Sequence, residues 1–243
     1  FFADNLPAIS LLKLKYTYGL VGNDNIAEAS DRFFYLSDVS LNDGGRGYAW
    51  GSDYGNYYNG FNINRYSNPN VTWEVAEKTN YGLELELFSE LMIQMDYFTE
   101  NRKKIYEPRP VFPDTAGLTT VVSSNTGEVK SYGVDVAVDY NKSFTNGFFI
   151  TGRGTFTYAT NEVLVRNEPQ YQYEYLTAVG YHTNQSRGYI AERLFIDQTD
   201  IDNSPEQFNG LSGSQNTYLP GDIKYKDVNE DGKINELDRV AIG

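Results

Sequence analysis

The fold class is decided by one stretch of the chain, YGLELELFSELMIQMDYFTEN (Tyr81–Asn101). Leucine takes every second position up to Leu87, with glutamate between, and apolar residues again take every second position from Leu91 to Tyr97. A period of two is that of a β-strand, whose successive side chains point to opposite faces. Only the residues around Ser89 separate the two runs, so the stretch predicts two antiparallel strands joined as a tight hairpin.

The same alternation recurs on both sides of this hairpin. Over Leu12–Tyr18, leucine and tyrosine alternate with lysine and threonine. A second hairpin is predicted where Val134–Tyr140 leads through Asn146 and Gly147 into Phe148–Tyr158. No segment shows a comparable helical period of 3.6 residues. The sequence therefore predicts an antiparallel all-β protein.

The lengths of the strands and loops indicate which kind of β protein this is. The strands span roughly 9–11 residues or more, which is the length of a transmembrane β-strand. A soluble sandwich also has polar outer faces, so the loops discriminate better. Connections are short at one end, at Ser89-Glu90 and Asn141–Gly147, and long at the other, over Asn101–Lys130 and Asn161–Pro220. This asymmetry is typical of an outer-membrane barrel and unusual in a compact soluble domain.

Composition excludes several classes of function. The 243 residues carry a formal net charge of −13, whereas nucleic-acid binding requires a basic surface. The chain has no cysteine, which excludes disulfides, zinc–thiolate sites and thiol catalysis. Its single histidine, His182, stands in a stretch rich in tyrosine, glycine and asparagine, so histidine triads and histidine metal sites are not expected. No apolar run reaches the 18 or so residues of a membrane helix.

One segment carries site chemistry, DVNEDGKINELD (Asp227–Asp238). A twelve-residue calcium loop needs oxygen ligands at positions 1, 3, 5, 7 and 12, and glycine at position 6 for its sharp turn. Gly232 falls at position 6, and position 9, where contact often runs through water, also carries an oxygen. The segment predicts a structural Ca²⁺ site. Its ligands are Asp227, Asn229, Asp231, the backbone carbonyl of Lys233, Asn235 and Asp238.

The twelfth ligand departs from the usual pattern. Asp238 stands where a bidentate glutamate is usual, so fewer oxygen contacts and a lower affinity are expected. Extended chain at Pro220–Tyr225, in place of an entering helix, favours a structural clamp over a sensor. The alternative is a turn that binds no ion, because Asp, Asn and Gly are common in turns. The nearby Asp197, Asp200 and Asp202 lack ligand spacing and are expected to be solvated loop charges.

Five longer motifs follow one another along nearly the whole chain. They are LLKLKYTYGLVGN (Leu11–Asn23), NPNVTWEVAEKTNYGLELELF (Asn68–Phe88), MDYFTENRKKIYE (Met95–Glu107), NTGEVKSYGVDVAV (Asn125–Val138) and PGDIKYKDVNEDGKINELDRVAIG (Pro220–Gly243). In this order they resemble the C-terminal part of the SusC/RagA family of TonB-dependent outer-membrane transporters. The combination is far more specific than any one motif.

This resemblance implies a fold and a function. Family members are large barrels of about 22 strands with a plugged lumen, and they import glycans, oligosaccharides or peptides with energy delivered through TonB. A SusD-like surface lipoprotein closes the extracellular mouth. Residues 1–243 are then part of a lipid-embedded barrel in the outer membrane of a Gram-negative bacterium, and residues 220–243 are an extracellular cation-binding segment. The implied barrel strands are Leu12–Tyr18, Trp73–Phe88, Leu91–Asn101, Lys130–Tyr140 and Phe148–Asn161.

The resemblance also implies that the chain is a fragment. It is expected to lack the N-terminal plug, the segment that contacts TonB, and the final strands, and so not to transport by itself. The alternative is a soluble calcium-binding interaction module of the dockerin type, which shares Asp at loop position 12. Such a module needs two loops on short helical segments, and this chain carries one.

No enzymatic activity is predicted. The carboxylate pairs Glu84 with Glu86 and Asp135 with Asp139 each share a strand face, which explains them as polar-facing residues. Acid–base catalysis needs carboxyl groups placed across a cleft. Substrate-binding residues stay unassigned, because the loop tyrosines suit sugar stacking and ordinary packing equally. These tyrosines are Tyr171, Tyr173, Tyr175 and Tyr189.

Overall fold

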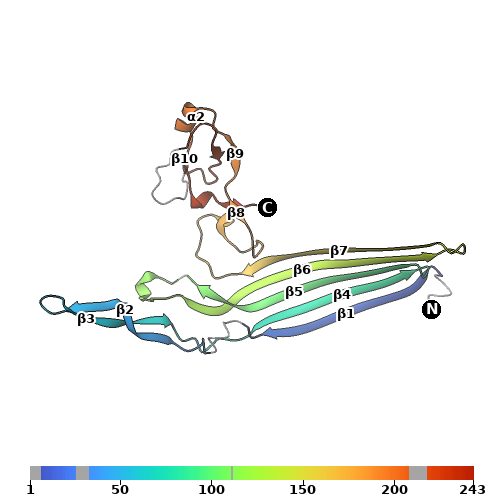
Figure 1. The fold of residues 1–243 in the computed structure, drawn as a ribbon, viewed down its shortest axis with the longest axis horizontal. Coiled ribbons are helices and arrows are strands. Elements are labelled where there is room, and N and C mark those ends of the chain that lie inside the picture. Colours follow the sequence, from blue (N-terminus) through green and yellow to red (C-terminus); the bar gives the residue numbers. More distant parts are fainter. Residues whose placement is uncertain (1–6, 26–32, 111, 208–217) are drawn as a thin grey trace. The chain divides into compact units, whose positions relative to one another are not determined.

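The computed structural model describes residues 7–25, 33–110, 112–207 and 218–243 (Figure 1). The chain divides into two compact units, Phe1–Pro169 and Gln170–Gly243. The first is built of long antiparallel strands, and the second of loops with very short strands. Within the described residues, no helix has the length and apolar character needed to cross a membrane.

The first unit is dominated by a five-stranded sheet in the order β1-β4-β5-β6-β7. Every neighbouring pair is antiparallel, and the strands run side by side as a long ribbon (Figure 1). This confirms the predicted antiparallel all-β fold. The strands are β1 Ile9–Asn23, β4 Glu74–Leu87, β5 Leu91–Arg109, β6 Val122–Ser143 and β7 Phe149–Val165.

Both predicted hairpins are present, and each closes with a tight turn. Between β4 and β5, Phe88 and Ser89 adopt positive φ angles of 54° and 55°, a left-handed conformation that costs energy for residues other than glycine. The N–H of Glu90 donates to the carbonyl of Leu87 at 3.0 Å and closes this turn. Between β6 and β7, Gly147 supplies the positive φ, at 84°.

The first of the two long connections at the other end is shorter than the sequence predicted. The expected loop Asn101–Lys130 is wrong in extent, because β5 continues to Arg109 and β6 begins at Val122. The actual connection covers residues 110–121 and contains the short 3-10 turn η1, Asp114–Ala116. Here the backbone ladder continues after the hydrophobic alternation has stopped, so alternation underestimates the strand length.

A hairpin that the sequence did not predict lies between β1 and β4. Its strands are β2 (Asp38–Trp50) and β3 (Asn56–Arg65), which pair with several register shifts. Glycine and asparagine interrupt any alternation in these strands, which explains why the pattern missed them. The segment after β3 is tied to the β5–β6 end of the sheet, where the Asn68 amide donates to the carbonyl of Ser123 at 2.9 Å.

The second unit is held together by three two-stranded pairs. They are β8–β13 and β9–β11, both antiparallel, and β10–β12, which is parallel. Its buried apolar residues are Phe195, Ile201 and Ile234, with the polar Gln207 and Asp238 buried among them. The strands are β8 Arg187–Gly188, β9 Ala191–Leu194, β10 Glu206–Gln207, β11 Ile223–Tyr225, β12 Lys233–Ile234 and β13 Val240–Ala241. The helical elements are α2 Gln198–Asp202 and the 3-10 turns η2 Glu174–Leu176 and η3 Glu236–Asp238.

Candidate functional site

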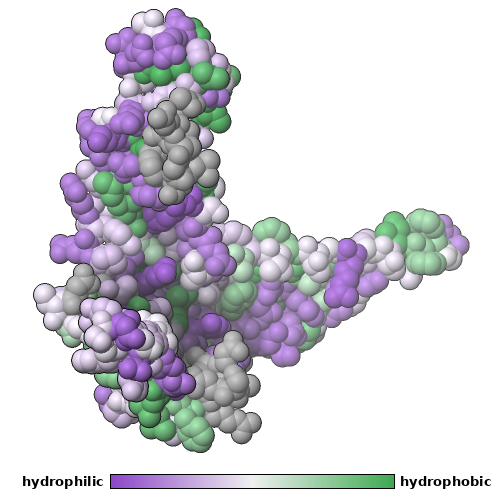
Figure 2. All heavy atoms as spheres, turned by 60° about the vertical axis from the view of Figure 1, so that its left-hand side comes forward, coloured by the Kyte–Doolittle hydropathy of each residue, from purple (hydrophilic) through white to green (hydrophobic). Residues whose placement is uncertain are grey.

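One face of the five-stranded sheet is apolar and uncovered. The register places one apolar residue from each strand in a row across it: Leu14, Leu83, Met95, Val136 and Phe156. Leu14 is 77% exposed and Phe156 is 60% exposed, and Figure 2 shows apolar residues lying at the surface of the molecule. Soluble monomers rarely expose a continuous apolar surface of this kind, so this face is suited to lipid.

An aromatic row borders the apolar face. The neighbouring row on the same face lies two residues away on each strand. The register brings together there Tyr16, Tyr81, Tyr97, Val134 and Tyr158. The ring centroids of Tyr16 and Tyr81 lie 5.1 Å apart, and those of Tyr81 and Tyr97 lie 6.4 Å apart. Aromatic belts mark the boundary between membrane and water, because the ring is apolar and the hydroxyl is polar. The row therefore has the character of an interfacial girdle.

The opposite face of the sheet carries several ion-paired charges. Glu84 lies between two lysines, with its carboxylate 3.3 Å from Lys13 Nζ and 2.9 Å from Lys15 Nζ. Glu100 pairs in the same way with Lys78 and Arg102. Glu84 is thus ion-paired with two lysines of β1, as expected for a polar-facing residue. A further pair on this face is Arg153–Asp139, whereas Lys103–Glu77 and Lys142–Glu90 lie on the other face, near the two ends of the strands.

Beyond the aromatic row, the strands become polar on both faces. On β5 the change comes after Phe98, where the sequence TENRKKIYEPR carries charged residues at both odd and even positions. The facing part of β6, VSSNTGEVKS, is equally polar. The apolar band therefore covers only the half of the sheet nearest the tight turns.

The predicted cation loop lies in the second unit, between β11 and β13. Asp227 and Gly232, at positions 1 and 6, are joined by a 2.8 Å hydrogen bond from the glycine N–H to Asp227 Oδ2. The other carboxylate oxygen, Asp227 Oδ1, is buried and has no hydrogen-bond partner. Glu230 and Gly232 have positive φ angles of 59° and 84°, which produce the sharp turn.

The remaining predicted ligands are held by local hydrogen bonds. Asn229 and Asp231 face each other, with Asn229 Nδ2 donating to Asp231 Oδ2 at 3.0 Å. The N–H of Lys233 donates to Asp231 Oδ1 at 2.9 Å. Asn235 caps η3 by accepting from the N–H of Leu237 at 2.7 Å. Each of these contacts fixes the side chain of a residue at an odd position of the loop.

Asp238 has a structural role that the sequence did not predict. It is fully buried, and its two carboxylate oxygens accept 2.8 Å hydrogen bonds from the N–H groups of Val228 and Asn235. This carboxylate therefore joins the entrance of the loop to its exit. Among the described residues, no three His, Cys, Asp or Glu side chains are gathered in a metal-binding arrangement. The cation site remains a prediction.

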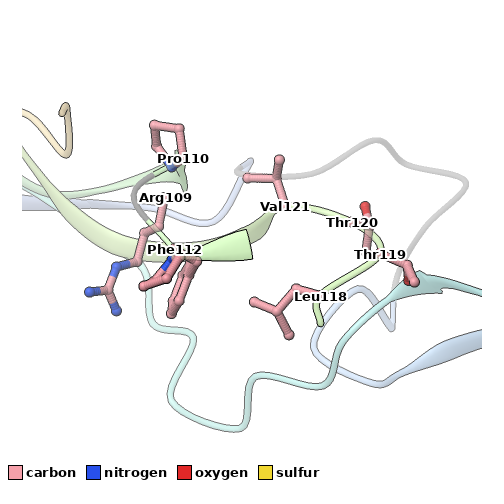
Figure 3. Close-up of a pocket in the computed structure, with 8 residues that line it drawn as sticks. Arg109, Pro110, Phe112, Leu118, Thr119, Thr120 and Val121 are labelled. Carbon is pink, nitrogen blue, oxygen red and sulfur yellow. The ribbon is translucent and has the colours of Figure 1, made fainter. Parts of the chain in front are cut away.

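A pocket of about 210 Å³ lies at the β5–β6 connection (Figure 3). It is lined by Arg109, Phe112, Leu118 and Val121 among others, and the Arg109 guanidinium lies 5.3 Å from the centre of the Phe112 ring. Ligand pockets for drug-sized molecules usually measure about 300–1,000 Å³. The pocket is too small to enclose an oligomeric nutrient.

Three of the loop tyrosines pack within the second unit. The hydroxyl of Tyr175 donates to the carbonyl of Leu237 at 2.6 Å, and the Tyr189 ring lies 5.5 Å from that of Tyr225. Tyr173 stacks on Tyr175 with ring centroids 5.5 Å apart. These contacts are packing interactions within the second unit and involve no ligand.

The expected solvated role is wrong for Asp200, whose side chain is mostly covered and ion-paired, whereas Asp197 and Asp202 are exposed. Asp197 caps the N-terminus of α2, accepting from the N–H of Asp200 at 2.8 Å. Asp200 forms a two-pronged ion pair with Arg193 and a second pair with Lys224 at 3.4 Å. Arg193, the N–H of Ile196 and Lys224 hold the pKa of the Asp200 carboxyl far below its usual range. These bonds connect β9, α2 and β11.

A sheet with an apolar, aromatic-bordered face, an ion-paired opposite face and tight turns at one end is the wall of an outer-membrane-type barrel. The family model for the TonB dependent receptor-like β-barrel matches residues 34–237, and the chain belongs to this family. The resemblance found in the sequence motifs is thereby confirmed.

Two TonB-dependent receptors of Formosa agariphila are similar in sequence. One is 27% identical over 164 residues, which cover 67% of this chain and 14% of that protein. The other is 24% identical over 263 aligned residues, which cover 100% of this chain and 24% of that protein. The chain thus spans about a quarter or less of the length of these relatives.

Solved structures of the RagAB peptide importer have the same fold. In its closed-closed state the TM-score is 0.60 with 18% identity, and in its open-open state it is 0.63 with 18% identity. Both matches cover 99% of this chain and 24% and 23% of the importer chain, respectively. The likeness confirms the barrel-strand architecture, although the described sheet does not close on itself.

Proposed function

We propose that the protein to which this chain belongs imports peptides or oligosaccharides across the outer membrane of a Gram-negative bacterium. In this proposal TonB supplies the energy, and a SusD-like surface lipoprotein closes the extracellular mouth. The chain contributes part of the barrel wall and no catalytic step. The two-faced sheet carries the proposal, because its apolar rows suit lipid and its ion-paired face suits a polar lumen.

Cell fractionation tests the membrane placement. The intact protein is expected in the outer-membrane fraction and in solution only with detergent. Recovery from the aqueous fraction without detergent would instead favour a soluble calcium-binding module. The test compares the intact protein with a soluble periplasmic marker from the same cells.

Uptake measurements test the transport activity and its substrate. Cells lacking the gene are expected to lose accumulation of a labelled peptide or oligosaccharide pool, and cells lacking TonB are expected to show the same loss. The RagAB structures are of a peptide importer, which favours peptides as the first substrate to test. Unchanged uptake of both pools in both strains would contradict the proposal. Purification in mild detergent tests the partner, since a surface lipoprotein is expected to co-elute.

A further inference from the structure

We propose that the loop Asp227–Asp238 binds a calcium ion that locks the second unit, residues 170–243, by stabilising the β10–β12 pair. The inference concerns the folding of this unit and does not depend on what the barrel transports. Its starting point is the sequence spacing of oxygen-bearing residues, in which all the required positions are filled. The structure adds two independent observations, which are an orphan carboxylate oxygen and a set of contacts that connect the loop to the rest of the unit.

The orphan oxygen belongs to Asp227, at position 1 of the loop. Its Oδ2 accepts the Gly232 N–H, which directs the carboxylate toward the inside of the turn. Its Oδ1 is buried without a partner, and a buried unpaired acceptor is costly, more so when charged. A cation coordinated by this oxygen would remove that cost. No protein donor does so in the described structure.

Binding requires a small rearrangement of two other ligands. Asn229 and Asp231 now hydrogen-bond to each other, and an ion would replace this bond with coordination by both side-chain oxygens. The Lys233 carbonyl and the fully buried Asp238 would complete the oxygen set, with Asn235 acting through water. Because Asp238 already accepts three N–H groups, from Val228, Asn229 and Asn235, it offers less to the ion than a bidentate glutamate. We therefore expect an affinity in the range of extracellular calcium modules, a Kd of roughly 10⁻⁴–10⁻³ M.

The loop is connected to the strands around it. Lys233 and Ile234 form β12, which pairs with Glu206 and Gln207 of β10. Ile234 is 2% exposed and Gln207 is 3% exposed, so each strand of this pair contributes one side chain to the buried core of the unit. The Gln207 side chain continues the connection to β11, donating to the Ile223 carbonyl at 3.0 Å and accepting from the Tyr225 N–H at 2.6 Å. An ion that fixes the loop would therefore stabilise both strand pairs.

The ligand chemistry favours calcium over magnesium. All the ligands are oxygens, including an amide and a backbone carbonyl, on a loop that must adjust to the ion. Calcium accepts six to eight such ligands in flexible geometry, whereas magnesium demands a near-ideal octahedron and keeps several waters. The ion stabilises the folded unit by mass action, because the unfolded loop does not gather these oxygens.

Hydrogen–deuterium exchange on the intact detergent-solubilised protein tests the proposal. Exchange is measured in EGTA, in about 5 mM Ca²⁺ and in about 5 mM Mg²⁺. Calcium is expected to slow exchange of β10, β11 and β12 by about 6- to 50-fold, as the Kd range above implies at this concentration. Magnesium is expected to do much less, and β4–β7 are expected to be unchanged. Equal exchange of β10–β12 in calcium and EGTA would overturn the proposal.

Two matched variants assign the effect to the loop. Asp227→Asn keeps an acceptor for Gly232 but places an NH₂ group where the orphan oxygen lies, so the calcium effect is expected to vanish. Glu230→Gln removes the same charge at position 4, which supplies no ligand, so the effect is expected to persist. The proposal fails if Glu230→Gln abolishes the calcium effect or Asp227→Asn retains it. Should Asp227→Asn prevent folding, the wild-type comparison between calcium and EGTA still decides the matter.

Discussion

The two units of the chain differ in how many of their apolar side chains they bury. Among the described residues, the five-stranded sheet contributes one buried apolar side chain, Val163, while leaving rows of leucine and tyrosine exposed. The far shorter second unit buries three apolar side chains around Gln207 and Asp238. The sheet is thus suited to an environment in which lipid covers its apolar face. The second unit has a small core of its own, connected by polar side chains that bond to backbone groups.

The largest loss of stability is expected from a charged residue introduced on the apolar face of the sheet. Leu85 lies between the aromatic row and the tight turn, in the row formed with Leu12, Ile93 and Val138. Leu85→Arg is expected to destabilise the barrel by about 2–4 kcal/mol, the cost of arginine facing lipid near the midplane. Denaturant unfolding of the intact protein in lipid vesicles measures this cost.

Gln94→Arg is the matched control, because Gln94 lies opposite Glu84 on the ion-paired face. Its expected cost is within about 1 kcal/mol, since the charge stays on the polar side and has a carboxylate nearby. Equal losses for the two arginines would mean that the apolar face does not contact lipid.

The next effect concerns close packing between strands. A Cβ atom on Gly133 would lie 2.4 Å from the carbonyl oxygen of Tyr158 and 2.5 Å from the Phe98 ring. Gly133→Ala is expected to cost about 1–3 kcal/mol, because a neighbouring backbone cannot move as a side chain can. The same unfolding assay measures it. Gly154→Ala is the control, since its Cβ would meet nothing within 4 Å; similar losses would contradict the packing argument.

In the second unit, the buried polar side chain of Gln207 is expected to contribute substantially to the free energy of unfolding. Gln207→Ala leaves the Ile223 carbonyl and the Tyr225 N–H without their partner, at a cost of about 1–3 kcal/mol. Hydrogen exchange of β11 is expected to accelerate while that of β4–β7 stays unchanged. Gln198→Ala on α2 removes one exposed side-chain bond and is expected to change little. Acceleration of β4–β7 would show that the two units unfold together.

The smallest effect is a pH dependence confined to the second unit. The lowered pKa of Asp200 means that its ionised form stabilises the folded unit above the ordinary carboxyl value of 3.8. This contribution is lost as the pH falls below that value toward the lower folded pKa. Exchange of β9 and α2, corrected for intrinsic rates, is expected to accelerate below about pH 4.

Asp200→Asn tests this assignment. The variant lacks the titrating group, so it is expected to exchange faster than wild type near neutral pH and to show a weaker acid response. Asp202→Asn, on the same helix but bonded to the Gln198 amide, serves as the control. An acid response of Asp200→Asn equal to that of wild type would exclude the Arg193–Asp200–Lys224 cluster as its source.

The sequence predicted the sheet well, because lipid imposes a strict period of two on strands such as β4. The sequence pattern underestimated the lengths of β5 and β6 beyond the apolar band. There both faces of the strand are polar, as at the successive residues Lys103 and Lys104, so the alternation disappears. The pattern missed β2 and β3 for a similar reason. The spacing of the cation loop was visible in the sequence. The burial of Asp238 and the central position of Gln207 were not, because both depend on contacts between segments that are distant in the chain.

The length of the strands has a consequence for anything that docks at the mouth of the barrel. The 22 residues of β6 extend roughly 75 Å at about 3.4 Å per residue, and a tilt of about 40° still leaves more than twice the 25 Å apolar band. The wall around β6 therefore extends beyond the apolar band as hydrogen-bonded backbone and forms a rim there. A partner that binds this rim meets a surface already ordered, so little conformational entropy is lost on association.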